Sequence, residues 1–185
     1  MKGYFCITGT PGTGKKTIAP AVASLLRVPC YGLTDLAVRY CMVDVEEAGE
    51  VDAVRLGRRL REDVSEGCVL FGHLIPYALK KCDVARAVVL RCEPAVLKAR
   101  LKARGYSRAK IVGDFEAELI GVIATDSIAA FGHAKVSEFD NSTATPGEAA
   151  REVARLLSDS SARPCPVDWL CSYDSPRALK SLYAF

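Results

Sequence analysis

Residues 9–17 read GTPGTGKKT, and this stretch decides the fold of the 185-residue chain. Gly9, Gly14 and Lys15 have the spacing G-x-x-x-x-G-K, which is typical of a loop that cradles phosphate groups. The stretch follows an apolar, β-rich run at 3–9 and precedes a helical pattern at 15–27, which is the context that the motif requires. A tight strand-to-helix turn without a ligand is the alternative, but glycine count, lysine position and context all favour a phosphate loop.

The residue types predict how the loop binds a nucleoside triphosphate. Glycines let backbone N–H groups approach phosphate oxygens, and the start of the following helix adds a positive end. Lys15 is expected to reach the β- and γ-phosphates. The predicted binding residues are Gly9, Gly12, Thr13, Gly14, Lys15, Lys16 and Thr17.

One position departs from the motif. The residue after Lys15 is normally Ser or Thr, whose hydroxyl binds Mg²⁺, but Lys16 stands there. Two hypotheses follow. Either Lys16 points into solvent while phosphates and water hold the metal, or its ammonium partly replaces the metal.

Composition limits the class of protein. Lys plus Arg number 25 and Asp plus Glu 22, a net charge of +3 that is too mild to demand a nucleic-acid partner. No apolar run reaches the roughly 18–20 residues of a membrane helix, and no signal peptide is recognised. We therefore expect a cytoplasmic protein that contacts neither membrane nor nucleic acid directly. The eight cysteines lack C-x-x-C and zinc spacing, so reduced structural thiols are expected, with a Cys165–Cys171 bridge as the alternative in a thermophile.

Short apolar runs alternate with helical periodicities along the chain. Strands are predicted at 3–9, 28–33, 68–72, 85–92 and 134–140, and helices at 15–27, 34–40, 51–65, 75–81, 93–104, 108–131 and 146–157. Thr34 is the predicted N-cap of the second helix, and Leu25 and Val54 are expected to face the interior. The alternation predicts an α/β fold of three layers, in which helices cover both faces of a parallel five-stranded sheet. Residues 42–50 are expected to form a loop.

Several motifs together resemble one family. GTPGTGKKT looks like the loop of the adenylate-kinase-like ATPases that assist small-ribosomal-subunit maturation in archaea and eukaryotes. Further matches follow in order at LTDLA (33–37), VLFGH (69–73), VVLRCEPAVLKARLKARGYSRAKI (88–111), DFEAE (114–118) and VDWL (167–170). The resemblance covers residues 3 to about 170, and the loop and the 88–111 block are its specific parts. It implies a P-loop NTPase fold, adenylate-kinase-like with a short lid.

This resemblance also implies a division of the chain. A kinase domain is expected over 1–157, with a monophosphate-binding region at about 33–56 and the lid at about 104–114. The tail at 158–185 opens like a linker, so it either packs back on the domain, is partly disordered or docks a partner.

Family roles carry over to matching residues in the lid and beyond. Arg104 matches the lid arginine that contacts ATP, and Arg108 and Lys110 are nearby cations unless they only form a solvated face. His73 matches a histidine beside the end of the third strand and is either catalytic or structural. The segment 141–143 lies where related kinases hold adenine.

On the acceptor side the match is less complete. Asp35 matches the acid near the monophosphate site, although it could simply cap a helix. The family places an arginine at the position of Val38, whereas this chain has Arg39 one residue later. The family acid at the end of the third strand, which orients Mg²⁺ and its water, is replaced by Phe71. With Lys16 and Phe71 both changed, no protein ligand to the metal is predicted, and altered metal handling or weak turnover is expected.

The function that the resemblance implies is phosphoryl transfer from ATP to AMP, with Mg²⁺ as cofactor, ATP hydrolysis as a side reaction and lid closure to exclude water. It further implies a link to small-subunit rRNA and ribosome maturation through a small-subunit ribosomal protein. The alternative is an assembly factor with little kinase activity that nucleotide switches. It would use the tail and the basic run at 58–61, which is otherwise an exposed helix face. A kinase of another small molecule is the third hypothesis.

Overall fold

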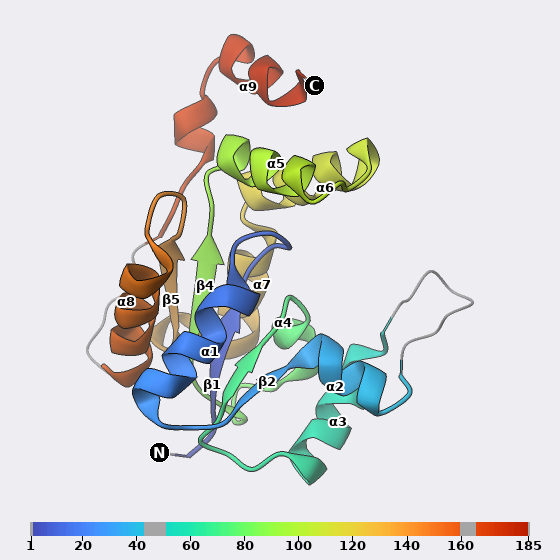
Figure 1. The fold of residues 1–185 in the computed structure, drawn as a ribbon, viewed down its shortest axis with the longest axis vertical. Coiled ribbons are helices and arrows are strands. Elements are labelled where there is room, and N and C mark those ends of the chain that lie inside the picture. Colours follow the sequence, from blue (N-terminus) through green and yellow to red (C-terminus); the bar gives the residue numbers. More distant parts are fainter. Residues whose placement is uncertain (1, 43–50, 160–165, 185) are drawn as a thin grey trace.

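The computed structural model describes residues 2–42, 51–159 and 166–184, and a parallel sheet forms its centre (Figure 1). The strands are β1 (Tyr4–Thr8), β2 (Cys30–Gly32), β3 (Val69–Phe71), β4 (Val84–Arg91) and β5 (Val136–Asp140), in the spatial order β2-β3-β1-β4-β5. Cys6 in the central strand lies opposite Leu70 on one side and Ala87 on the other. All pairings are parallel, so the predicted five-stranded parallel sheet is confirmed.

Helices cover both faces of the sheet. The first face carries α1 (Lys15–Leu26) and α8 (Pro146–Ser158), which lie side by side in Figure 1. The second face carries α2 (Leu33–Arg39), α3 (Ala53–Asp63), α4 (Ile75–Ala78) and α7 (Val122–Phe131). Two further helices, α5 (Pro94–Ala103) and α6 (Arg108–Leu119), project beyond the carboxyl ends of the strands. A short 3-10 segment at His133–Lys135 leads into β5.

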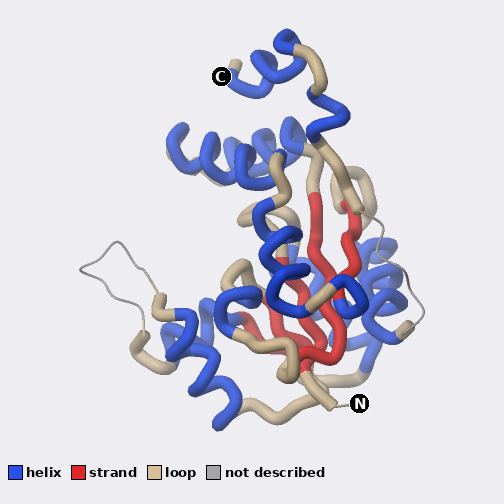
Figure 2. The backbone as a smooth tube through the Cα atoms, turned by 180° about the vertical axis from the view of Figure 1, so that it is seen from behind, coloured by secondary structure: helices blue, strands red, loops and turns tan. Residues whose placement is uncertain are grey.

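The described part of the tail lies against the projecting helices. A 3-10 turn (Leu170–Tyr173) and α9 (Pro176–Tyr183) sit next to α5 and α6, at the end of the molecule opposite the N-terminus (Figures 1 and 2). Trp169, Tyr173 and Leu182 are buried in a cluster with Leu97 and Leu101 of α5. Residues 166–184 thus pack back on the domain, which is one of the arrangements expected of the tail; docking of a partner by the tail stays a prediction.

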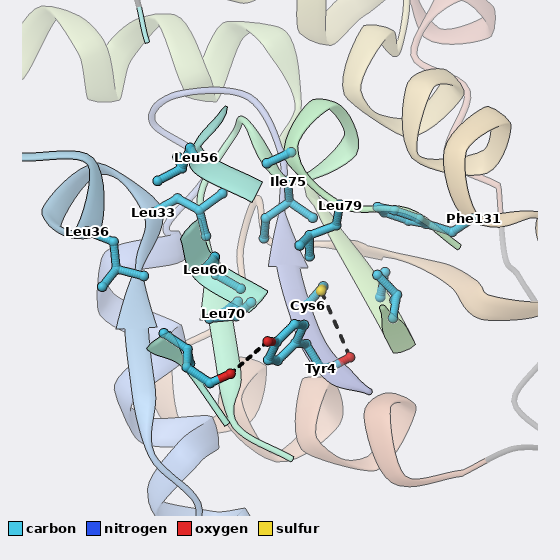
Figure 3. Packing of buried hydrophobic residues seen from close by; sticks show 14 of the residues in the cluster. Tyr4, Cys6, Leu33, Leu36, Leu56, Leu60, Leu70, Ile75, Leu79 and Phe131 are labelled. Carbon is cyan, nitrogen blue, oxygen red and sulfur yellow. Dashed lines mark hydrogen bonds between the residues drawn. The ribbon is translucent and has the colours of Figure 1, made fainter. Parts of the chain in front are cut away.

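The core on the second face is shown in Figure 3. Leu56 and Leu60 of α3 are one helical turn apart; Leu60 lies next to Leu70 of the sheet, and Leu56 lies toward Leu33 of α2. The hydroxyl of Tyr4 is buried beneath them and donates to the carbonyl of Val64 at 2.7 Å, so this polar group is satisfied. These contacts fix α3 over the sheet.

Two side chains expected in the interior are on the surface. Val54 is 68% exposed and Leu25 is 53% exposed. Val54 precedes Leu56 by two residues, which is about 200° around a helix, so it faces away from the buried side of α3. At the end of α1, Leu26 packs against the core while Leu25 does not.

Two predicted boundaries are also wrong. Thr34 is not an N-cap, because α2 already begins at Leu33 and is capped by Gly32 in extended backbone. The single helix expected at 108–131 is two helices, since Gly121 adopts a left-handed φ of 68° between α6 and α7. Residues 43–50 of the predicted loop and Cys165 of the candidate bridge lie outside the described residues. Every helix in the described ranges is too short or too polar to cross a bilayer.

Candidate active site

The phosphate loop runs from the end of β1 into α1, and its glycines are required by the backbone itself. Gly9 has φ 136° and Gly14 has φ 106°, values that other residues rarely adopt. A Cβ at Gly9 would lie 2.3 Å from the carbonyl oxygen of Leu90, and one at Gly14 would lie 2.6 Å from the amide nitrogen of Asn141. Glycine is therefore the residue that allows β4 and the 141–143 segment to approach the loop closely.

Lys15 is folded back onto this loop. Its Nζ donates to the carbonyl oxygens of Gly9 at 2.6 Å and Thr10 at 2.9 Å, and the residue is 9% exposed. Burial lowers the pKa of Lys15 to about 7, although the carboxylates of Glu118 and Asp114 act in the opposite direction. Neutral carbonyl dipoles are a weak substitute for an anion, so the ammonium is poised to meet phosphate.

A cavity of about 250 Å³ opens beside the loop and gathers residues from four regions of the chain. It is lined by Pro11, Gly12, Gly14, Lys15, Lys16 and Thr17 of the loop, Gly32, Thr34 and Asp35 around the start of α2, Phe71, Gly72 and His73 at the end of β3, and Arg104 and Tyr106 after α5. The structure thus brings Asp35, His73 and Arg104 together with Lys15. Lys16 is exposed and also lines this cavity, so its position is compatible with both hypotheses for it.

A second cavity, of about 390 Å³, lies on the other side of the loop. It is lined by Gly12, Gly14, Thr17, Ile18, Arg100, Ala103, Arg104, Asn141, Ala144 and Pro146. The Asn141 amide donates to the Thr13 carbonyl at 2.8 Å. Arg100 donates to the carbonyls of Asn141 and Ser142 at 2.9 and 3.0 Å. The predicted adenine segment is therefore fastened to the loop, and Gly12, Gly14, Thr17 and Arg104 line both cavities.

The basic residues of α2 and α3 lie elsewhere. Arg39 lines a separate cavity of about 480 Å³ together with Arg55 and Arg58, so the structure does not bring it to the loop. In the basic run at 58–61, Arg59 forms ion pairs with Glu62 at 3.3 Å and Asp63 at 3.1 Å, and Arg61 pairs with Asp83 at 3.0 Å. Two of the three arginines of this run are thus engaged within the chain.

The end of β3 contributes a histidine and an aromatic ring, His73 and Phe71, to the cavity. Burial lowers the pKa of His73, and the charges of Lys15 and Lys110 lower it further, so the imidazole is neutral at neutral pH. Phe71 is half-buried and packs closely on Gly32, where a Cβ would lie 2.9 Å from its ring. An apolar ring therefore stands where the resemblance predicts an acid.

Two carboxylates of α6 were missed by the sequence-based predictions. Lys110, Asp114 and Glu118 are spaced by four residues, so they share one face of the helix, and this spacing is the signal that was available. The face lies over the loop, because Glu118 accepts a hydrogen bond from the Thr10 hydroxyl at 2.5 Å. Asp114 is one turn away; its Oδ2 is buried without a hydrogen bond, although the Lys110 ammonium lies 3.3 Å from it.

Comparisons with known proteins agree with this geometry. Residues 6–121 match the model of a family described as "AAA domain". A protein of Thermococcus onnurineus named "Putative adenylate kinase" is 34% identical over 171 residues, which cover 91% of this chain and 92% of that protein. An Archaeoglobus fulgidus protein of the same name is 37% identical over 177 residues, covering 89% and 90% of the two chains. The solved structure of Acinetobacter baumannii shikimate kinase with shikimate has a TM-score of 0.66 at 13% identity, covering 88% and 97%, which shows the shared P-loop kinase fold.

Proposed function

Because the chain belongs to the family of the archaeal proteins named "Putative adenylate kinase", we propose that it transfers a phosphoryl group from ATP to AMP. The observation that carries the proposal is the pair of cavities that meet at the loop and at Arg104. An ATPase needs room for one nucleotide, whereas a nucleotide kinase needs room for a donor and an acceptor. In this proposal, ATP occupies the cavity beside Asn141 and AMP occupies the cavity beside Asp35.

Lys15 and Arg104 carry the charge stabilisation in this mechanism. The Lys15 ammonium exchanges its two carbonyl partners for the β- and γ-phosphates, and the N–H groups at the start of α1 support them. Arg104 lines both cavities, so its guanidinium is placed to contact the phosphoryl group as charge moves between them. Positioning and charge stabilisation are the main requirements of phosphoryl transfer, and these residues supply both.

His73 is assigned to the side reaction. The attacking atom of AMP is a phosphate oxygen that already carries charge, so transfer to AMP needs no general base. Water does need orientation or deprotonation, and a neutral imidazole at the cavity can accept its hydrogen bond. We therefore assign His73 mainly to ATP hydrolysis.

Mg²⁺ is the expected partner of ATP, and it would screen the phosphate charges when bound. Within the described ranges, no three His, Cys, Asp or Glu side chains gather as metal ligands. Mg²⁺ commonly keeps several waters and takes only one or two carboxylates in addition to substrate phosphates. Asp114 is the carboxylate we assign to this role: its buried Oδ2 has no hydrogen bond, and a bound metal would share that oxygen with the Lys110 ammonium, which lies 3.3 Å from it.

The first experiment compares ADP formation from ATP plus AMP with phosphate release from ATP alone. AMP should strongly accelerate ADP formation, and Lys15→Ala should lower both rates by about 100-fold or more, as expected for removal of a transition-state cation. His73→Ala should lower phosphate release more than transfer. If AMP has no effect while ATP still binds, the kinase proposal fails and the nucleotide-switched assembly factor takes its place.

The same assay tests the metal assignment when it is combined with ATP binding measured with and without Mg²⁺. Asp114→Asn should lose most of the gain in ATP affinity that Mg²⁺ gives the unmodified chain. Lys110→Gln removes the ion pair but keeps the carboxylate, so its Mg²⁺ gain should persist. Equal losses in the two variants would contradict a metal-directed role for Asp114. The link to ribosome maturation stays a prediction from the resemblance.

A further inference from the structure

Glu118 is a buried carboxylate at which four segments of the chain meet. Its Oε1 accepts hydrogen bonds from Arg91 Nε at 2.7 Å, the Cys92 backbone N–H at 3.0 Å and the Trp169 indole at 3.2 Å. Its Oε2 accepts from the Thr10 hydroxyl at 2.5 Å. Only 2% of the side chain is exposed, so these charge-assisted bonds are shielded from water. The phosphate loop, β4, α6 and the tail are therefore joined at one group.

Thr10 is the point at which this network reaches the catalytic lysine. Its hydroxyl is held by Glu118, while its carbonyl accepts from Lys15 Nζ at 2.9 Å and from the Thr13 hydroxyl at 2.9 Å. The orientation of the Thr10 carbonyl thus affects both one acceptor of Lys15 and the position of Thr13 in the loop.

The tail holds Glu118 from the other side. Trp169 is 9% exposed, and its indole is a donor to Glu118. The Val167 carbonyl accepts from Arg91 at 2.9 Å, so the segment just before Trp169 is bound to the same arginine. Arg91 also pairs with Glu138 of β5. These contacts explain why a segment more than 150 residues from the loop in sequence lies within two hydrogen bonds of it.

We propose that Glu118 and Trp169 are positioning residues of the nucleotide site: Trp169 fixes Glu118, and Glu118 fixes Thr10 of the phosphate loop. Residues 166–173 are then a working part of the site. Because Lys15 must leave the Thr10 carbonyl to reach phosphate, nucleotide binding changes the environment of Thr10, Glu118 and the indole together. The inference rests on nucleotide binding at the loop and is independent of transfer to AMP.

The experiment uses Trp169 as a reporter, since it is the one tryptophan in the sequence. Tryptophan emission of the full chain is followed during titration with ATP, and binding is measured in parallel by calorimetry. We expect a saturable change in emission whose midpoint equals the calorimetric dissociation constant. In Thr10→Val, ATP should still bind, more weakly, and the emission change at saturation should be lost. No change in the unmodified chain, or the same change in Thr10→Val, would overturn the proposal.

A second readout separates positioning from a purely structural role. Trp169→Phe keeps an aromatic ring but removes the donor, and it should raise the KM for ATP by up to about 10-fold, the limit set by losing one hydrogen bond to a charged group. The KM for AMP should stay unchanged. The matched control is Tyr183→Phe, which removes a 2.6 Å hydrogen bond from the tail to Glu116 of α6 and should leave both constants unchanged. Equal effects of the two variants would contradict the proposal. If AMP does not accept phosphate, the tryptophan-emission and calorimetric titrations with ATP alone still test this proposal.

Discussion

At the scale of the residue, Lys15 is governed by what surrounds its ammonium. The two nearest acceptors are neutral carbonyls, and the side chain is largely removed from water. Its pKa of about 7 therefore reflects desolvation that the more distant carboxylates do not offset. A phosphate group beside the ammonium supplies a full negative charge, so the pKa must rise when nucleotide binds.

This difference makes ATP binding depend on pH. Above about pH 7 the free lysine is increasingly neutral, so binding takes up a proton, and the dissociation constant for ATP should rise by up to about 10-fold per pH unit above about pH 8. Calorimetry in buffers of different ionisation enthalpy would count the protons directly. Lys15→Arg should show a flat profile, because guanidinium stays protonated. Zero proton uptake by the unmodified chain across this range would show that Lys15 is already charged before ATP arrives.

Sequence spacing predicts local motifs better than it predicts long-range contacts. Lys15, Asp35, His73 and Arg104 each belong to a short recognisable pattern, and the structure brings all four to one cavity. The spacing of Glu118 from Asp114 indicates a shared helix face, but no local pattern indicates its contact with Thr10, which lies 108 residues away. Arg39 has the right chemistry for a phosphate, but its place at the end of α2 directs it to another cavity.

At the scale of the element, the sheet was predictable and the helix boundaries were less so. β1 and β3 are short apolar runs, as is common for strands buried on both faces of a parallel sheet, whereas β5 reads VSEFD and is only partly buried. Helix ends depend on single backbone conformations instead. The left-handed Gly121 divides α6 from α7 within a continuous helical pattern. The hydrophobic periodicity alone does not indicate this break.

Packing between α3 and α4 gives a stability prediction with an internal control. A Cβ at Gly57 would lie 1.7 Å from the Ala78 carbonyl oxygen, so Gly57→Ala forces the two helices apart and should cost about 3 kcal/mol. Gly113 lies inside α6 with open space around it, and Gly113→Ala should stabilise by roughly 0.5–1 kcal/mol through helix propensity. Thermal unfolding should show a melting temperature lower by roughly 6–12 °C for the first and slightly higher for the second. Similar shifts in both would refute the close approach of α3 to α4.

At the scale of the whole molecule, the phosphate loop lies between two cavities, and helices from opposite faces of the sheet line them. The α1–α8 side, with Asn141 and Pro146, forms one cavity, and the α2 side, with Asp35 and His73, forms the other. Helices α5 and α6 lie beyond the strand ends, and Arg104 between them reaches both cavities. The parallel sheet therefore places the phosphate loop between the two cavities that the proposed function assigns to the donor and the acceptor.

A ligand that fills both spaces tests this arrangement at equilibrium. Two adenosines joined through five phosphates should bind about 100-fold or more tightly than ATP, because the second adenosine arrives at a high effective concentration. Asp35→Asn should weaken this ligand while leaving the affinity for ATP unchanged, since Asp35 lines only the acceptor cavity. Lys15→Ala should weaken both ligands. A joined ligand that binds no better than ATP would mean that the acceptor cavity does not take a nucleotide, and ATP hydrolysis would then be the reaction that the loop supports.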